Sequence, residues 1–330
     1  MVRVKKILIA TAILLFVSPV LKAQNRGNSF IWGVNGHPLT QPDYRNNLDE
    51  QIKAIKDLKL SSYRFDVILN QDGYAKNESA FLNVLNSLKS NAILPLPAVM
   101  QTGLGSGGPD QVYKKGFEQG KNFGSRYGDY LSVLEVNNEG DNKIRIRNKP
   151  AGGIKEGEYD TTKAQRFIAE IKGFIDGIKT VKPSIKITLS VSFTHYYYLQ
   201  LLKDNNVNYD IIGCHWYSNM GDITNLKPLG NVLISMNQRF NKPIWITEIN
   251  RFKGTSSVDF ASQNEYITTN IKKIMAQGIV KAIYIYELFD QPSLAKRYPA
   301  EAHYGLMYKD ASGNYVQKDA YQGFKKFAKK

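Results

Sequence analysis

Residues 162–191 read TKAQRFIAEIKGFIDGIKTVKPSIKITLSV. Apolar residues recur at helical spacing as far as Val181, which predicts an amphipathic helix. Pro183 cannot continue this helix, and a β-rich run over residues 185–191 follows it at once. A helix that leads directly into a strand is the repeating unit of parallel α/β folds.

Further β-rich runs extend this alternation along the chain. The predicted strands are residues 30–35, 61–67, 92–99, 132–137, 185–191, 209–215, 243–247 and 280–286, with helical patterns between them, for example over residues 47–58 and 79–88. Eight strand–helix repeats in about 300 residues match a closed (β/α)8 barrel, the TIM barrel, which we predict as a single α/β domain over residues 24–330. A doubly wound open sheet is the alternative, but the turn after the first run, from Val34 to Pro38, lacks the glycine-rich motif of that fold.

The first 23 residues have the pattern of a signal peptide. Basic residues such as Lys5 and Lys6 precede an apolar run over residues 7–21, and a cleavage site follows at Ala23. The run is shorter than the ~20 residues of a membrane span, which disfavours the alternative of an uncleaved anchor. We therefore expect a secreted or periplasmic protein without stable membrane insertion after signal cleavage.

The chain has one cysteine, four histidines and a formal net charge of +15. Cys214 lies in an apolar run, which predicts a core residue, and a single cysteine permits no intramolecular disulfide. The histidines show no close metal-ligand spacing, so we expect neither a catalytic metal nor another cofactor. The basic residues are spread along the chain, which favours a solvated surface over a nucleic-acid site and ranks polyanion binding last. We expect a monomer.

Two isolated carboxylates stand at strand ends where a barrel enzyme places its active site. Glu139 follows the fourth predicted strand and Glu248 follows the seventh. Glycoside hydrolysis with retention needs one carboxylic acid and one nucleophilic carboxylate about 5–5.5 Å apart. Salt bridges at the barrel mouth are the alternative reading of the same two residues.

The segment RYGDYLSVLEVNNE (126–139) looks like the fourth-strand motif of glycoside hydrolase clan A, and is closest to the pattern of families 39, 51 and 79. This resemblance implies that Glu139 is the general acid/base and that Asn138 binds the sugar 2-hydroxyl. It also implies a β-linked glycan as the substrate. An acid that donates a proton near neutral pH needs a raised pKa, so we expect one for Glu139.

Three further segments resemble the same clan in the same order. KPIWITEIN (242–250) is similar to the nucleophile motif and implies that Glu248 attacks the sugar. DIIGCHWYS (210–218) resembles the sixth strand, whose tyrosine, here Tyr217, hydrogen-bonds the nucleophile. SYRFD (62–66) carries Arg64, which matches the arginine that supports the nucleophile.

The chain also departs from the clan pattern. Tyr286 stands where relatives often place a tryptophan beneath the sugar, and Gly140 stands where proline is common. We expect His37 and His215 either to bond sugar hydroxyls or to be structural, and Glu135 to form an ion pair inside the barrel. The sequence thus predicts an exported retaining glycoside hydrolase, with a catalytically silent glycan-binding barrel as the alternative.

Overall fold

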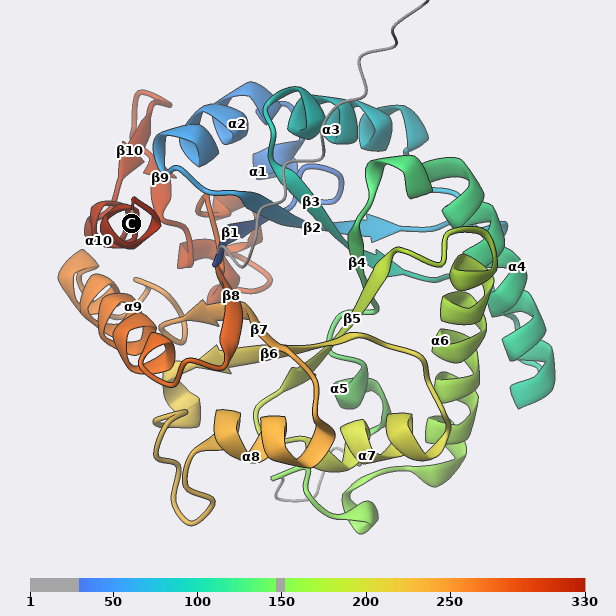
Figure 1. Cartoon of the computed structure of the whole chain (residues 1–330). Coiled ribbons are helices and arrows are strands. Elements are labelled where there is room, and N and C mark those ends of the chain that lie inside the picture. The colour runs from blue at the N-terminus through green and yellow to red at the C-terminus, as the bar shows by residue number, and fades with distance from the viewer. Residues whose placement is uncertain (1–29, 147–151, 330) are drawn as a thin grey trace, which may run out of the picture.

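The computed structural model describes residues 30–146 and 152–329, in which eight parallel strands form a closed barrel (Figure 1). Each strand pairs with the next in sequence, and β8 closes the barrel against β1. The strands are β1 Ile31–Gly36, β2 Ser62–Ile68, β3 Leu94–Met100, β4 Val133–Val136, β5 Lys186–Ser192, β6 Ile211–Tyr217, β7 Ile244–Asn250 and β8 Val280–Ile285. All eight overlap the predicted runs, so the (β/α)8 prediction is confirmed. The predicted signal peptide lies outside the described residues.

Helices surround the barrel (Figure 1). The longer ones are α2 Leu48–Asp57, α3 Glu78–Ser90, α4 Pro109–Tyr127, α6 Thr161–Val181, α7 Tyr196–Asp204, α8 Val232–Phe240, α9 Phe260–Met275 and α10 Asp319–Ala328; α1 Pro42–Arg45 and α5 Gly140–Ile144 are short. The side chain of Asp160 caps α6 by accepting a hydrogen bond from the backbone N–H of Lys163 at 3.0 Å. A hairpin of β9 Met307–Lys309 and β10 Tyr315–Gln317 precedes α10. In the part of the chain that the structure describes, no helix is long and apolar enough to cross a membrane.

Helices α4 and α6 pack unusually closely because glycines face each other across their contact. A Cβ atom at Gly120 would lie 2.0 Å from the carbonyl oxygen of Phe174, and one at Gly173 would lie 2.2 Å from the carbonyl oxygen of Tyr113. Only glycine allows two helix backbones to approach to this distance. The contact fixes α6 against α4, and α6 also contacts α5, which begins directly after Glu139.

The core has two parts, one between strands and helices and one inside the barrel. The interior part contains Trp245 and Tyr284, whose rings stack with centroids 6.2 Å apart. Cys214 and Trp216 are fully buried in the outer part, which confirms the prediction for Cys214. These apolar side chains fill much of the barrel interior, and the polar side chains at the strand ends gather toward its carboxyl-end rim.

Candidate active site

Glu139 and Glu248 converge at this rim. One carboxylate oxygen of each, together with a ring nitrogen of His215, lies within 4.8 Å of the others. The side chain of Glu139 is 28% exposed and that of Glu248 is 7% exposed, so both reach solvent from the rim. Their separation is close to the ~5–5.5 Å of retaining glycosidases.

The backbone after β4 turns sharply to aim Glu139 at its partner. Asn137 and Glu139 have φ values of 60° and 44°, which lie in the left-handed region that non-glycine residues seldom adopt. The hydroxyl of Ser190 on β5 accepts a hydrogen bond from the Glu139 backbone N–H at 2.9 Å and holds the turn. A Cβ atom at Gly140 would lie 2.6 Å from the Tyr198 hydroxyl, which explains why the chain departs here from the proline of relatives.

Arg64, on β2, organises the floor of the site. It is 3% exposed and donates five hydrogen bonds of 2.7–2.8 Å, two to Glu135 and one each to Asn35, Asn138 and Glu248. A guanidinium has five N–H donors, so every donor of Arg64 is used within the protein. Glu135 is fully buried and confirms the predicted ion pair, while Asn138 faces the site with its oxygen bound to Arg64.

A second hydrogen bond orients Glu248 from β6. The Tyr217 hydroxyl donates to Glu248 Oε2 at 2.6 Å, the contact that the sequence resemblance implied. A shift in strand register between Cys214 and His215 places His215 directly opposite Glu248 on β7. The irregularity therefore puts two polar side chains side by side at the rim.

His215 lies between the two glutamates. Its Nδ1 is 2.9 Å from Glu139 Oε1 and 3.4 Å from Glu248 Oε2. Burial lowers the pKa of His215, but the charge of Glu248 and the hydrogen bond to Glu139 outweigh burial and raise it above 6.5. Burial likewise raises the pKa of Glu139, but the hydrogen bond and charge of His215 outweigh it and leave the pKa below 4.5. The expectation of a raised pKa for Glu139 is thus wrong for the substrate-free protein, because the hydrogen bond and charge of His215 favour the ionised carboxylate.

Among residues 30–146 and 152–329, these three side chains also form the only group that offers three potential metal ligands. The Nδ1 atom that would bind the ion faces both carboxylates, and its raised pKa favours a proton there. A metal would have to displace that proton, since only unprotonated imidazole binds metals. The geometry fits an acid–base cluster better than a metal centre.

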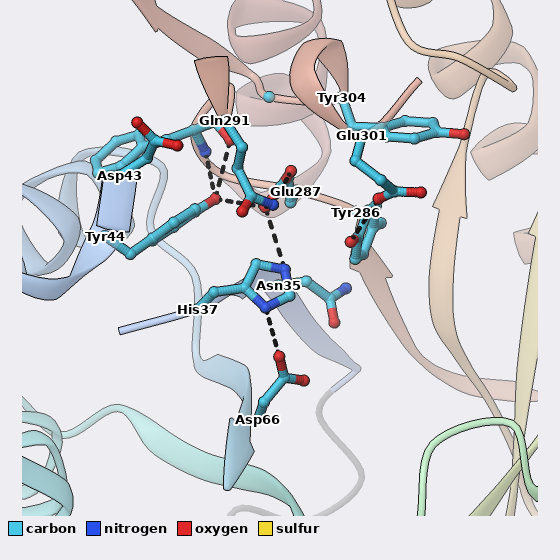
Figure 2. Close-up of polar contacts among 12 residues, drawn as sticks. Asn35, His37, Asp43, Tyr44, Asp66, Tyr286, Glu287, Gln291, Glu301 and Tyr304 are labelled. Atoms are coloured by element: carbon cyan, nitrogen blue, oxygen red, sulfur yellow. Dashed lines mark hydrogen bonds and ion pairs between the residues drawn. The ribbon is translucent and has the colours of Figure 1, made fainter. Parts of the chain in front are cut away.

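A second polar cluster borders the site beside β1 and β8 (Figure 2). His37 Nδ1 lies 2.6 Å from Asp66, and its Nε2 lies 3.3 Å from Glu287. Glu287 is fully buried and accepts hydrogen bonds of 2.8 Å from Tyr44 and Gln291. Burial lowers the pKa of His37, but the two carboxylates outweigh it and raise the pKa well above 6.5. Both ring nitrogens of His37 therefore face carboxylates, which leaves neither free for a sugar hydroxyl in this structure.

The rim encloses a cavity of about 420 Å³, here called the glycone cavity, which is lined by Glu139, Glu248, Arg64 and residues of the second cluster. Tyr217, Tyr286 and Tyr304 form one wall with ring centroids 5.4–6.2 Å apart. Tyr286, the predicted sugar platform, thus lines the cavity, and its hydroxyl donates to Glu301 at 3.0 Å (Figure 2).

Sequence reasoning missed several residues that line the glycone cavity or bond to its glutamates. Asp66 ends the SYRFD segment but has no assigned role there, and Glu301 and Tyr304 lie in the connection beyond β8, where no spacing rule applies. Asn142 donates to Glu139 Oε2 at 2.9 Å from the first turn of α5. Residues three apart on a helix are neighbours, so the position of Asn142 three residues after Glu139 was the one sequence signal for this contact.

Known proteins resemble this chain in sequence and in fold. The model of glycosyl hydrolase family 53 matches residues 125–327, which include both glutamates. The family 1 β-glucosidase from Thermotoga maritima is similar over 91% of this chain and 97% of its own, with a TM-score of 0.68 and 13% identity. A second structure, of β-glycosidase BGL167, covers 91% of this chain and 96% of its own, with a TM-score of 0.64 and 16% identity. Likenesses at these identities establish the fold alone, and no curated protein matches the sequence.

Proposed function

The chain belongs to glycosyl hydrolase family 53, and from this membership we propose that it is an exported retaining hydrolase that cleaves β-linked glycans by double displacement. It is a glycoside hydrolase on the clan A barrel. The motif resemblance identified the clan but not the family, since it favoured families 39, 51 and 79. Clan members share the residues at the strand ends that carried the resemblance.

The observation that carries the proposed mechanism is the approach of Glu139 to Glu248 within 4.8 Å. In the first step, a Glu248 oxygen bonds to the anomeric carbon while the bond to the leaving oxygen breaks and that oxygen takes a proton from Glu139. In the second step, Glu139 removes a proton from water, whose oxygen bonds to the anomeric carbon and displaces Glu248, so that Glu139 ends protonated and Glu248 ends as a carboxylate. Arg64 and Tyr217 hold Glu248 in place for attack.

We propose that His215 supplies the proton of the first step. The pKa of His215 is raised and that of Glu139 is lowered, and the two groups lie 2.9 Å apart, so we expect the pair to titrate as one unit. The alkaline limb of kcat/KM should lie above pH 6.5, where the proton leaves His215. Replacing His215 with Asn should move this limb to lower pH, because the remaining proton then sits on a carboxyl group. An alkaline limb at the same pH in this variant as in the wild type would contradict proton supply by His215.

The lining of the glycone cavity supports a neutral sugar at the cleavage site. Asp66 and Glu301 lie in its wall and can accept hydrogen bonds from sugar hydroxyls, whereas Arg64 has no donor left for an acidic group. The tyrosine wall offers ring faces to the apolar face of a sugar. Family 53 is the endo-β-1,4-galactanase family, so we propose a β-1,4-linked galactan as the substrate.

Glu248→Gln tests the reaction. The variant should fold normally and lose turnover on a panel of β-linked polysaccharides, whereas Glu265→Gln, at an exposed position on α9, should not. NMR of the first-formed product should show the β-anomer before mutarotation. Equal activity of Glu248→Gln and the wild type, or an α-anomer, would refute the assignment. Binding of oligosaccharides without hydrolysis across the panel would instead favour the silent glycan-binding barrel.

The export proposal rests on residues 1–23 and has its own test. Expression of the full chain in a Gram-negative host should yield protein in the periplasm or medium whose N-terminal sequence begins at Gln24. Retention of residues 1–23 on membrane-bound protein would show an anchor instead.

A further inference from the structure

A second cavity adjoins the glycone cavity at the acid/base glutamate. It has a volume of about 640 Å³, and Asn138 and Glu139 line both cavities, whereas Glu248 lines only the first. In double displacement the sugar that becomes bonded to the nucleophile occupies the first cavity. The group that Glu139 protonates departs on the side of Glu139 that faces away from Glu248, so we call the second space the leaving-group cavity. Its volume suits a sugar ring.

The leaving-group cavity is lined by three cationic side chains, those of Lys143, Arg145 and Lys163. Among the described residues that line this cavity, the only carboxylate besides Glu139 is that of Asp160, which caps α6 and lies 3.3 Å from Lys163. The glycone cavity has the opposite character, since carboxylates outnumber cations in its wall. The two halves of the cleft therefore differ in electrostatic sign.

Lys143 and Arg145 have no carboxylate within 4.0 Å among the residues that the structure describes. The ammonium of Lys143 donates to Asn137 Oδ1 at 2.8 Å and lies 5.3 Å above the Phe167 ring. Both contacts hold the side chain in place without neutralising its charge. Glu170 acts on Lys143 only from beyond ion-pair distance.

A chain of buried hydrogen bonds holds the guanidinium of Arg145 in one orientation. Its Nη1 donates to His195 Nε2 at 3.0 Å, and His195 Nδ1 in turn contacts the buried carboxylate of Asp141. The Nε atom of Arg145 is buried and has no hydrogen-bond partner within the described structure. A guanidinium held in one orientation presents a planar fork of donors, which matches the oxygens of a carboxylate or sulfate.

We infer that the leaving-group cavity binds a sugar that carries an anionic substituent, so that among β-1,4-galactosyl bonds the enzyme prefers those between a neutral galactose and an acidic sugar on its reducing side. The inference rests on the proposed function, because it takes Glu139 as the acid/base. The shared chemistry is a carboxylate or sulfate group on the leaving sugar. The acidic wall of the glycone cavity excludes such a group from the other side of the bond.

Three oligosaccharides test the inference directly. Each has galactose β-1,4-linked to the leaving sugar, which differs only at C6 as a carboxylate, a sulfate ester or a hydroxymethyl group. We expect kcat/KM at low ionic strength to be roughly fivefold or more higher for an anionic form, from two to three exposed ion pairs. This preference should shrink in 0.5 M NaCl, where the screening length falls to roughly 4 Å. Whichever of the carboxylate and sulfate substrates has the higher kcat/KM identifies the preferred anionic substituent.

Two double variants that lose the same charge test which lysines cause the preference for anionic substrates. Lys143→Gln combined with Lys163→Gln should remove most of the preference. Lys272→Gln combined with Lys281→Gln removes the same charge from exposed positions at the opposite end of the barrel and should leave the preference intact. Equal kcat/KM for the three substrates in the wild type, or equal loss in both double variants, would overturn the inference.

If the wild type hydrolyses none of the three, the proposed function fails, and calorimetric binding of the same oligosaccharides decides the inference separately. Tighter binding of an anionic form that depends on Lys143 and Lys163 would support it, and equal binding would refute it.

Discussion

Replacing Arg64 with Met should destabilise the protein severely. The guanidinium is 3% exposed and forms an ion pair with Glu135, which is fully buried, so the substitution leaves an unpaired carboxylate inside the barrel. Removing one partner of a buried ion pair costs about 3–5 kcal/mol. With a urea m-value of about 3 kcal/mol/M, the midpoint of unfolding should fall by roughly 1–1.7 M. Fluorescence reports the transition, because the three tryptophans, Trp32, Trp216 and Trp245, are all buried.

A second substitution separates the lost ion pair from lost packing. Glu135→Gln in the Arg64→Met background removes the stranded charge, so the double variant should recover about 2 kcal/mol relative to Arg64→Met. Arg64→Lys should also be destabilised, because an ammonium has three donors for five acceptors. A loss below about 1 kcal/mol in Arg64→Met, or a double variant that is less stable than the single one, would refute the reasoning.

Three further changes have defined outcomes. Tyr217→Phe removes the 2.6 Å hydrogen bond to Glu248 and should lower kcat/KM at least about tenfold in steady-state assays. The reason is that hydrogen bonds to charged groups contribute about 1.5–3 kcal/mol. A decrease below twofold would contradict this role of Tyr217. Folding raises the pKa of His37, so its ion pairs stabilise the protein below about pH 6.5 and this contribution disappears as the pH rises through the folded-state pKa. His37→Asn should therefore flatten the fall in unfolding free energy between about pH 6 and 9, and an unchanged slope would argue against it. Gly33→Ala would place a Cβ atom 2.2 Å from the buried ring of Tyr284 and should cost about 1–3 kcal/mol in thermal or urea unfolding, whereas an unchanged midpoint would show that the ring can move.

The sequence alone determined the barrel and the positions of its two central carboxylates. Periodicity marks each strand locally, and a closed parallel barrel brings every strand's carboxyl end to one rim. Glu139 and Glu248 could therefore be placed together although they are far apart in the chain. The roles of Arg64 and Tyr217 came from the resemblance to clan A, and both residues also stand near strand ends.

Only the tertiary structure decided how these residues act on one another. The register shift that sets His215 opposite Glu248, and the raised pKa that the neighbouring glutamates give this histidine, depend on contacts between different strands. Glu301 enters the cavity from a long connection, and Arg145 owes its orientation to His195, which lies in the turn between β5 and α7. Side-chain direction, burial and mutual charge are properties of the packed chain, whereas strand periodicity is a property of neighbouring residues, so the sequence specifies the scaffold before it specifies the chemistry.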